Sequence, residues 1–113
     1  MNIEAIVIDY LQDKLQTDNV YGEIPDSPTG EFFVVDKTGS TTTDHTCTST
    51  VAVQSYGDTK AEAAESNERM KRAMEEIVEL DQVGGCHLDT DYNYTNIARK
   101  QYRYQAVYQI THY

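Results

Sequence analysis

The chain has 113 residues, a hydrophobic fraction of 39% and a formal net charge of −10 at pH 7. This length fits one domain with one modest core. The charge argues against general affinity for DNA phosphates and for anionic membranes, because both kinds of binding depend on lysine and arginine. Two explanations of the charge stay open, plain solubility and an electrostatic role toward a partner.

Cys47 and Cys86 lie far apart in the sequence and belong to no CxxC motif. We interpret them as free, half-buried thiols of a cytoplasmic protein, while the sequence alone leaves a disulfide open. The N-terminus has no basic region followed by an apolar stretch, and no apolar run reaches the length of a membrane span. We therefore expect neither a signal peptide nor a transmembrane helix.

An amphipathic helix is predicted from Ile3 to about Gln16, because apolar residues recur there at helical spacing. Asn2 can act as its N-cap by accepting a hydrogen bond from one of the first amides. The segment Thr17–Gly30 holds both prolines. It is predicted as a turn-rich connector, with a short edge strand at Val20–Glu23.

A β-hairpin is predicted next, with strands at Glu31–Lys37 and Cys47–Tyr56. Between them, Thr38–Thr46 is mostly threonine and serine, and we expect an exposed, mobile loop or hairpin tip. Long loops often serve binding, and simple tolerated length is the alternative. The candidate interaction residues of this loop are Thr38, Gly39, Ser40, Thr41, Thr42, Thr43, Asp44 and His45.

The strongest helix pattern lies between Thr59 and about Leu80. Gly57 and Asp58 end the preceding strand, and Thr59 with Glu62 has the T-x-x-E spacing of a capping box. Alanines dominate the first half of the apolar stripe, so the helix can approach the sheet closely there.

The remainder of the chain predicts a second hairpin. Asp81–Gly85 is the expected exit turn, with its paired glycines supplying unusual backbone angles. Cys86–Thr95 and Gln101–Tyr113 are expected strands, because apolar and polar residues alternate in both, and Asn96–Lys100 is the turn between them. We place Gln101–Tyr113 at or near the centre of the sheet, since neither Gly nor Pro interrupts it.

The main elements therefore follow the order α-β-β-α-β-β in a single domain. We predict an α+β fold in which an antiparallel or mixed sheet of about four strands carries two helices on one face. Polar residues of the closing hairpin form a second candidate interaction surface, with an ordinary solvent face as the alternative. The residues of this surface are Asp89, Asp91, Arg103, Gln105 and Gln109.

No motif predicts catalysis, a cofactor or a metal. The spacing Asp89-x-Asp91-x-Asn93 imitates the start of an EF-hand loop, but Tyr94 and Lys100 replace the glycine and glutamate that this loop needs. The three histidines lack metal-ligand spacing. Asp44-His45 lies beside many hydroxyls, but nothing there supplies an oxyanion hole. We therefore expect a non-enzymatic protein.

The order of features resembles the small tail-terminator and head–tail joining proteins of long-tailed bacteriophages and prophages. The matching pieces are the N-terminal helix with its Pro-containing connector and the strand EFFVVDKTG. The strand TVAVQSYGDT leading into KAEAAESNERMKRAMEEI matches as well, as does the closing hairpin of LDTDYNYTN and KQYRYQAVYQITHY. The similarity covers essentially the whole chain.

The resemblance implies a structural protein of the virion neck, assembled in the host cytoplasm. Such proteins form rings, commonly of six subunits, on the head-proximal end of the tail tube. The implied partners are further copies of the chain, the tail tube protein and the head connector protein, with no membrane. A subunit of charge −10 repeated around a ring would give an acidic annulus, through which DNA would pass without specific binding.

Two alternatives stay open. One is another neck component, such as a connector or completion protein of similar fold. The other is an acidic DNA mimic that blocks a host protein, with the glutamates of the long helix imitating phosphates. Arg69, Lys71 and Arg72 interrupt that row of glutamates, which favours a solvated helix with ion pairs.

Overall fold

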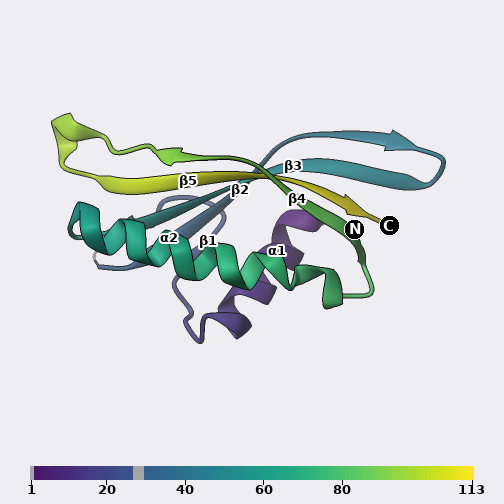
Figure 1. Cartoon of the computed structure of the whole chain (residues 1–113), viewed down its shortest axis with the longest axis horizontal. Helices are drawn as coiled ribbons and strands as arrows, with labels where there is room; N and C mark the ends of the chain where they lie inside the picture. The colour runs from purple at the N-terminus through teal and green to yellow at the C-terminus, as the bar shows by residue number, and fades with distance from the viewer. Residues whose placement is uncertain (1, 27–29) are drawn as a thin grey trace.

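Helices and hairpins alternate along the chain in a computed structural model that describes residues 2–26 and 30–113 (Figure 1). The helices are α1 (Ile3–Lys14) and α2 (Lys60–Glu75), and the strands are β1 (Val20–Tyr21), β2 (Phe32–Thr43), β3 (Thr46–Gly57), β4 (Val83–Asn93) and β5 (Tyr102–His112). Short 3₁₀ turns lie at Ile77–Glu79 and Ile97–Arg99. The predicted α+β class is confirmed.

Within the described residues, five strands form one sheet in the order β1-β2-β3-β5-β4. The pairs β2–β3, β3–β5 and β5–β4 are antiparallel, whereas β1 runs parallel to β2, so the sheet is mixed. The short β1 lies within the predicted edge strand Val20–Glu23 and extends the expected sheet of about four strands to five. β5 lies between β3 and β4, which confirms its predicted place near the centre.

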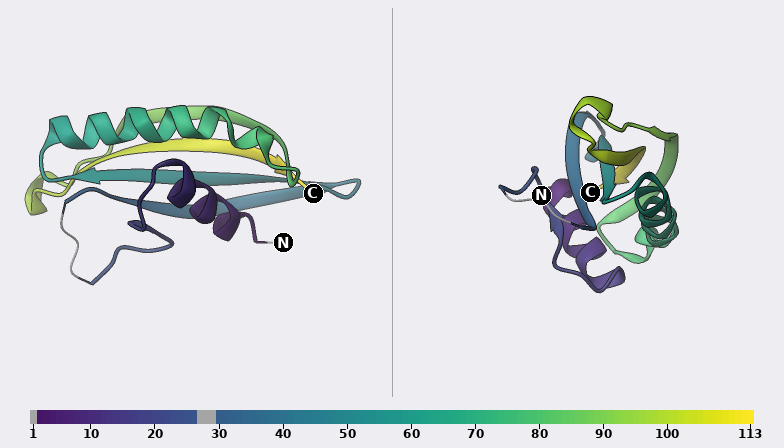
Figure 2. Two further views of the ribbon diagram at one scale, coloured as in Figure 1. Left: turned by 90° about the horizontal axis from the view of Figure 1, so that it is seen from below. Right: turned by 90° about the vertical axis from the view of Figure 1, so that its left-hand side faces the viewer.

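Both helices pack into one core on the same face of the sheet. Figure 2 shows α2 lying along the strands, and in Figure 1 α1 is inclined to it. The apolar stripe of α1 buries Ile3, Val7 and Leu11, and that of α2 buries Met70 and Met74. The residues that the sheet contributes to this core are Val20, Phe33, Val35, Val51, Val53, Val83, Ala106, Tyr108 and Ile110. The apolar face predicted for the last strand is therefore the one that the helices cover.

Side-chain caps set the beginning of each helix. The side chains of Asn2 and Thr59 each accept a hydrogen bond from an amide in the first turn, so both predicted N-caps are confirmed. α2 ends at Glu75, earlier than predicted, because the chain tightens into a 3₁₀ turn. That turn still brings Ile77 into the core.

A hydrogen bond joins the two helices. The Tyr10 hydroxyl of α1 donates to the Ala73 carbonyl of α2 at 2.7 Å. Burial of the hydroxyl raises the pKa of Tyr10 to about 12. At the surface, Lys14 lies 2.9 Å from Glu79 and 3.6 Å from Glu76, in ion pairs of the exposed kind that contribute little to stability.

The predicted hairpin and its exposed tip are confirmed, but the Thr-rich segment is an ordered pair of strands, so the predicted mobile loop is wrong. β2 and β3 stay paired as far as Thr43 and Thr46, with only Asp44 and His45 between them. These two turn residues have φ values of 49° and 70°, as in the type I′ turn that matches the twist of a hairpin. Threonine is β-branched and favours strands even where it is exposed, which the polarity of the segment concealed.

The predicted exit turn at Asp81–Gly85 is confirmed only at Asp81-Gln82, and the part predicted for the two glycines is wrong. β4 begins at Val83 and includes both glycines, neither of which has a positive φ. The space around Gly84 explains the first of them. A Cβ there would lie 2.9 Å from the hydroxyl of the exposed Tyr113 side chain, so this ring packs directly over the backbone of Gly84.

The predicted connector Thr17–Gly30 lies partly outside the described residues, because Pro28 belongs to the segment 27–29. The described part includes Pro25 and, apart from β1, contains neither a helix nor a strand. This part agrees with the predicted turn-rich connector.

Because α2 lies close to the end of β3, adding a methyl group at Gly57 should destabilise the fold. A Cβ on Gly57 would lie 2.6 Å from the Ala63 backbone nitrogen, so the helix would have to shift. We expect Gly57→Ala to lower the free energy of unfolding by about 1–3 kcal/mol, measured by urea denaturation. The matched control is Gly39→Ala, because nothing lies within 4 Å of a Cβ there. Equal stabilities of the two variants would contradict this account of the packing.

Candidate functional site

The candidate interaction loop forms one end of the molecule. Residues 38–45 are all exposed, and the turn Asp44-His45 projects past the end of β5 (Figure 1). Across the hairpin, Thr42 Oγ1 lies 3.2 Å from Cys47 Sγ. The segment therefore presents a two-stranded ribbon to a partner, in place of the disordered loop that composition suggested.

A β-bulge divides the second candidate surface. Arg103, Gln105 and Gln109 share the sheet face that points away from the helices. Between Leu88 and Thr90 the register of β4 shifts by one residue, with Asp89 as the extra residue. From Thr90 onward, each side chain therefore lies on the sheet face opposite to the one that regular alternation predicts. The five residues therefore do not share one surface. Regular alternation in the sequence gives no sign of such a shift.

Asp91 lies on the helix-covered face as a result of this bulge. Its carboxylate accepts a 2.9 Å hydrogen bond from Asn67 Nδ2 and forms a 2.5 Å ion pair with Lys71 Nζ. Both partners come from α2. Asp91 therefore fastens α2 to the β4 edge.

A chain of hydrogen bonds crosses the uncovered face of the sheet. Arg103 Nη1 donates to the Tyr56 hydroxyl at 3.0 Å, and that hydroxyl donates to Gln54 Oε1 at 2.8 Å. Gln54 Nε2 donates to Gln105 Oε1 at 2.8 Å, and Gln105 donates in turn to the Tyr92 hydroxyl. The network joins β3, β5 and β4 without help from a covering element.

Arg103 is held between two aromatic rings. Its guanidinium carbon lies 4.4 Å from the ring centre of Tyr94 and 5.7 Å from that of Tyr56. Its Nε also donates to the Tyr94 carbonyl at 2.8 Å. The predicted interface residue therefore already has a structural role within its own chain, through cation–π contacts and hydrogen bonds.

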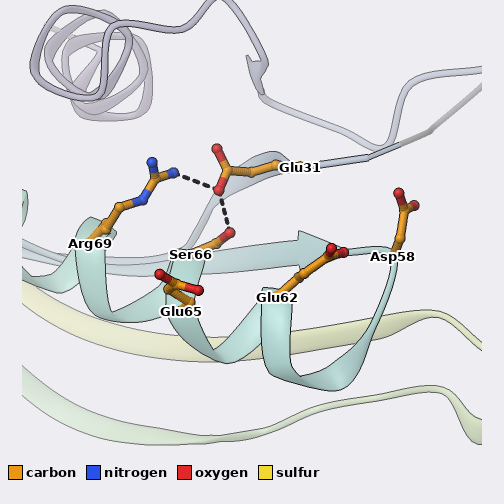
Figure 3. Close-up of a pocket in the computed structure, with 7 residues that line it drawn as sticks. Glu31, Asp58, Glu62, Glu65, Ser66 and Arg69 are labelled. Atoms are coloured by element: carbon orange, nitrogen blue, oxygen red, sulfur yellow. Dashed lines mark hydrogen bonds and ion pairs between the residues drawn. The ribbon is translucent and has the colours of Figure 1, made fainter.

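At the other end of the molecule, where α2 begins, lies an acidic hollow of about 400 Å³ (Figure 3). Glu31 Oε2 lies 2.5 Å from Arg69 Nη2 and accepts a hydrogen bond from the Ser66 hydroxyl. The Asp58 carboxylate accepts the Gly30 N–H at 3.1 Å. The residues that line the hollow are Glu31, Gly57, Asp58, Glu62, Glu65, Ser66 and Arg69.

The balance of charge in this hollow is negative, with four carboxylates and one guanidinium. This balance is complementary to the positive charge of a lysine or arginine side chain. Part of the arrangement has a simpler cause, since acidic residues near the first turn of a helix stabilise it. The capping-box spacing indicated Glu62, but nothing in the sequence placed Glu31 beside it, because Glu31 comes from the chain just before β2.

Ser49 and His112 form a buried pair that the sequence did not indicate. Ser49 Oγ lies 2.7 Å from His112 Nε2, and the two residues come from neighbouring strands. His112 Nδ1 has no hydrogen-bond partner within the described residues, and both side chains are shielded from solvent. The pair therefore lacks the orienting third group and the substrate access of a Ser–His catalytic site.

The two cysteines are free and half-buried, as predicted. Cys47 lies on β3 and Cys86 on β4, with β5 between them. Burial raises the pKa of the Cys86 thiol to about 11, so the reactive thiolate is scarce at neutral pH.

Among residues 2–26 and 30–113, no group of three or more His, Cys, Asp or Glu side chains is placed to hold a metal ion. In the same part of the chain, no helix combines the length and apolar character that crossing a membrane requires. When the chain is compared with known proteins, no family model and no curated protein matches it.

His112 predicts a pH dependence of stability. Burial lowers the pKa of His112 below its ordinary value of 6.5, with a smaller contribution in the same direction from Lys37, while the Tyr113 backbone opposes the shift. The unfolded chain then binds a proton more readily than the folded chain. The contribution of neutral His112 to stability is intact above about pH 6.5 and is lost as the pH falls below that value.

We therefore expect wild-type protein to lose more free energy of unfolding between about pH 7.5 and about pH 5.5 than His112→Gln does. The measurement is urea denaturation at a series of pH values. Exposed His87 supplies the control, and His87→Gln should keep the wild-type pH dependence. Parallel pH profiles of the wild type and His112→Gln would rule out this role of His112.

The stacking of Arg103 predicts that lysine cannot replace it. Lysine keeps the charge but has no planar group to stack on Tyr94, and its donors all sit on one nitrogen, whereas Arg103 uses its separate Nε and Nη1 for the Tyr94 carbonyl and the Tyr56 hydroxyl. We expect Arg103→Lys to lower the free energy of unfolding by about 1 kcal/mol in urea denaturation. Arg99→Lys, at an exposed residue of the β4–β5 turn, is the matched control and should be neutral. If both substitutions were neutral, the stacking would not contribute to stability.

Proposed function

We propose that the chain is a structural subunit of a bacteriophage or prophage neck. In this proposal, copies of it form a ring at the head-proximal end of a tail tube and join the tube to the head connector. The proposal rests on the resemblance described above, which covers essentially the whole chain. The observation that carries it furthest is the element order, in which α1 and a hairpin precede the long helix α2 and a second hairpin closes the sheet.

The unlike ends of the molecule also support this proposal. One end is the Thr-rich ribbon, which has no charged residue between Thr38 and Thr43. The opposite end carries the acidic hollow. A subunit of this kind suits a part that meets two different partners, the tube on one side and the connector on the other.

Ion pairs within the chain weigh against the DNA-mimic alternative. Lys71 lies 2.8 Å from Glu68, in addition to its contact with Asp91. Arg69 likewise pairs with Glu31. Two of the three cations that interrupt the row of glutamates, Arg69 and Lys71, are thus paired with carboxylates of their own chain, which reduces the negative charge that a phosphate mimic would need to display.

The first test is the mass of the protein in solution, by light scattering behind a sizing column across a concentration series at moderate salt. We expect a discrete ring, with six chains as the implied number. Added to polymerising tail tube protein, the ring should cap the tubes and shorten them in electron micrographs. Tubes that grow to the same length with and without the protein would contradict the proposal.

The acidic hollow can be tested in the same assay. The double variant Glu62→Gln, Glu65→Gln removes two of its carboxylates, while Glu75→Gln, Glu76→Gln removes as much charge from the other end of α2. If a basic group of a neck partner occupies the hollow, the first variant should lose capping or connector binding, and the second should keep both. Equal behaviour of the two variants would exclude a role for the hollow.

A further inference from the structure

The outer edge of β2 is unpaired over most of its length. β1 pairs with β2 only at Phe33 and Val34, and within the described residues no other strand adjoins this edge. At Lys37 the backbone N–H donates to Glu4 Oε2 of α1 at 3.0 Å, so α1 covers the edge up to that residue. The exposed stretch Thr38–Thr43 continues beyond it.

The hairpin register shows which backbone groups of this stretch point outward. Thr43 and Thr46 flank a two-residue turn and form a hydrogen-bonded pair, and such pairs alternate along an antiparallel ladder. The backbone N–H and C=O groups of Ser40 and Thr42 therefore point away from β3. Backbone groups directed outward from a sheet edge are a template for a further strand.

The two edges of the sheet differ in how they resist pairing. β4 has register shifts at two places and carries Asp89 and Asp91, and both features discourage another strand. Thr38–Thr43 contains neither a charge nor a proline. Its one register shift lies between Lys37 and Gly39, at the end of the stretch that is farther from the turn. Because molecules of charge −10 repel one another, an uncharged edge is where two copies approach at the lowest electrostatic cost.

We infer that two copies of the chain pair through this edge, with their β2 strands antiparallel. One register uses the outward backbone N–H and C=O groups of both Ser40 and Thr42. In this register Ser40 of each copy lies opposite Thr42 of the other copy, and the two-fold axis passes through Thr41. Each of these residue pairs exchanges two N–H···O bonds, so the two sheets join into one.

Charge complementarity supports the same register. It places Lys37 of each copy opposite the turn Asp44-His45 of the other copy. Within the described residues, neither Lys37 nor Asp44 has an ion-pair partner in its own chain. Two such contacts, related by symmetry, would flank the paired strands.

This pairing does not rest on the proposed neck function, and it would occupy the edge of the same Thr-rich ribbon that the neck proposal offers to a partner. A two-fold contact of one surface with itself closes at two copies. The acidic hollow lies at the far end of each molecule and stays accessible in the pair.

Proline substitutions test the edge while leaving the hairpin intact. Ser40→Pro and Thr42→Pro each remove an outward N–H, and neither removes a hydrogen bond between β2 and β3. In sedimentation equilibrium, we expect the wild type to reach twice the chain mass of 12.8 kDa and both variants to remain single chains. Circular dichroism spectra that match the wild type would show that the variants are folded.

A cysteine at the two-fold axis gives a second test that does not depend on proline. In the register above, the Thr41 residues of the two copies form a non-hydrogen-bonded pair with Cα atoms about 4.5 Å apart, within reach of a disulfide. In a Cys47→Ser, Cys86→Ser background, Thr41→Cys should form a covalent dimer on oxidation. Thr90→Cys in the same background is the matched control, at an exposed threonine of the β4 edge, and should not.

Each outcome separates this inference from the neck proposal. A single chain at all concentrations, together with no Thr41→Cys dimer, would overturn the pairing. A ring of six chains that survives both proline substitutions would also overturn it and would support the neck ring. A dimer that either proline dissolves would support the pairing and, without a larger ring, would count against the neck ring.

Discussion

The fold depends on one apolar sheet face that two helices must share. α1 buries its apolar stripe mainly against β1 and β2, and α2 buries its stripe against β3 and β5. α2 can lie close to the end of β3 only because Gly57 has no side chain there. The same closeness brings Glu31 beside Arg69 and Ser66 on α2. The acidic hollow is thus a consequence of how the core packs.

Because both helices lie on one face, the other face of the sheet has to satisfy its own polar groups. It does so with side chains that reach across strands, as in the chain of hydrogen bonds from Arg103 to Tyr92. Beside this network, Phe32 stacks on Tyr56 with ring centres 4.3 Å apart, and both rings are buried although no helix covers them. This face therefore combines a small aromatic cluster with a polar network, and its residues serve stability before any partner is considered.

Much of the fold could be predicted from local signals, because helix caps and helical periodicity depend on residues that are close together in the sequence. Asn2 and Thr59 cap their helices as expected. The predictions failed where a residue's role depends on its partners. Exposed threonines form a strand because β3 pairs with them, and Asp91 changes face because one residue bulges. The hollow and the Ser49–His112 pair join residues that are distant in sequence, and alternation cannot show such contacts.

The order of the strands in the sheet has a consequence for how the chain reaches this fold. β5 lies between β3 and β4, yet it follows both of them in the chain. Until β5 arrives, the inner edge of β3 stays open and β4 has no neighbour to pair with. Pairing β3 with β5 closes a long loop, which slows folding, because the entropy of closure must be overcome before the contacts form. An incomplete chain that has folded its first hairpin would therefore expose apolar Val51 and Val53 along an open strand. Such an edge is prone to aggregation, and a chaperone would bind it readily.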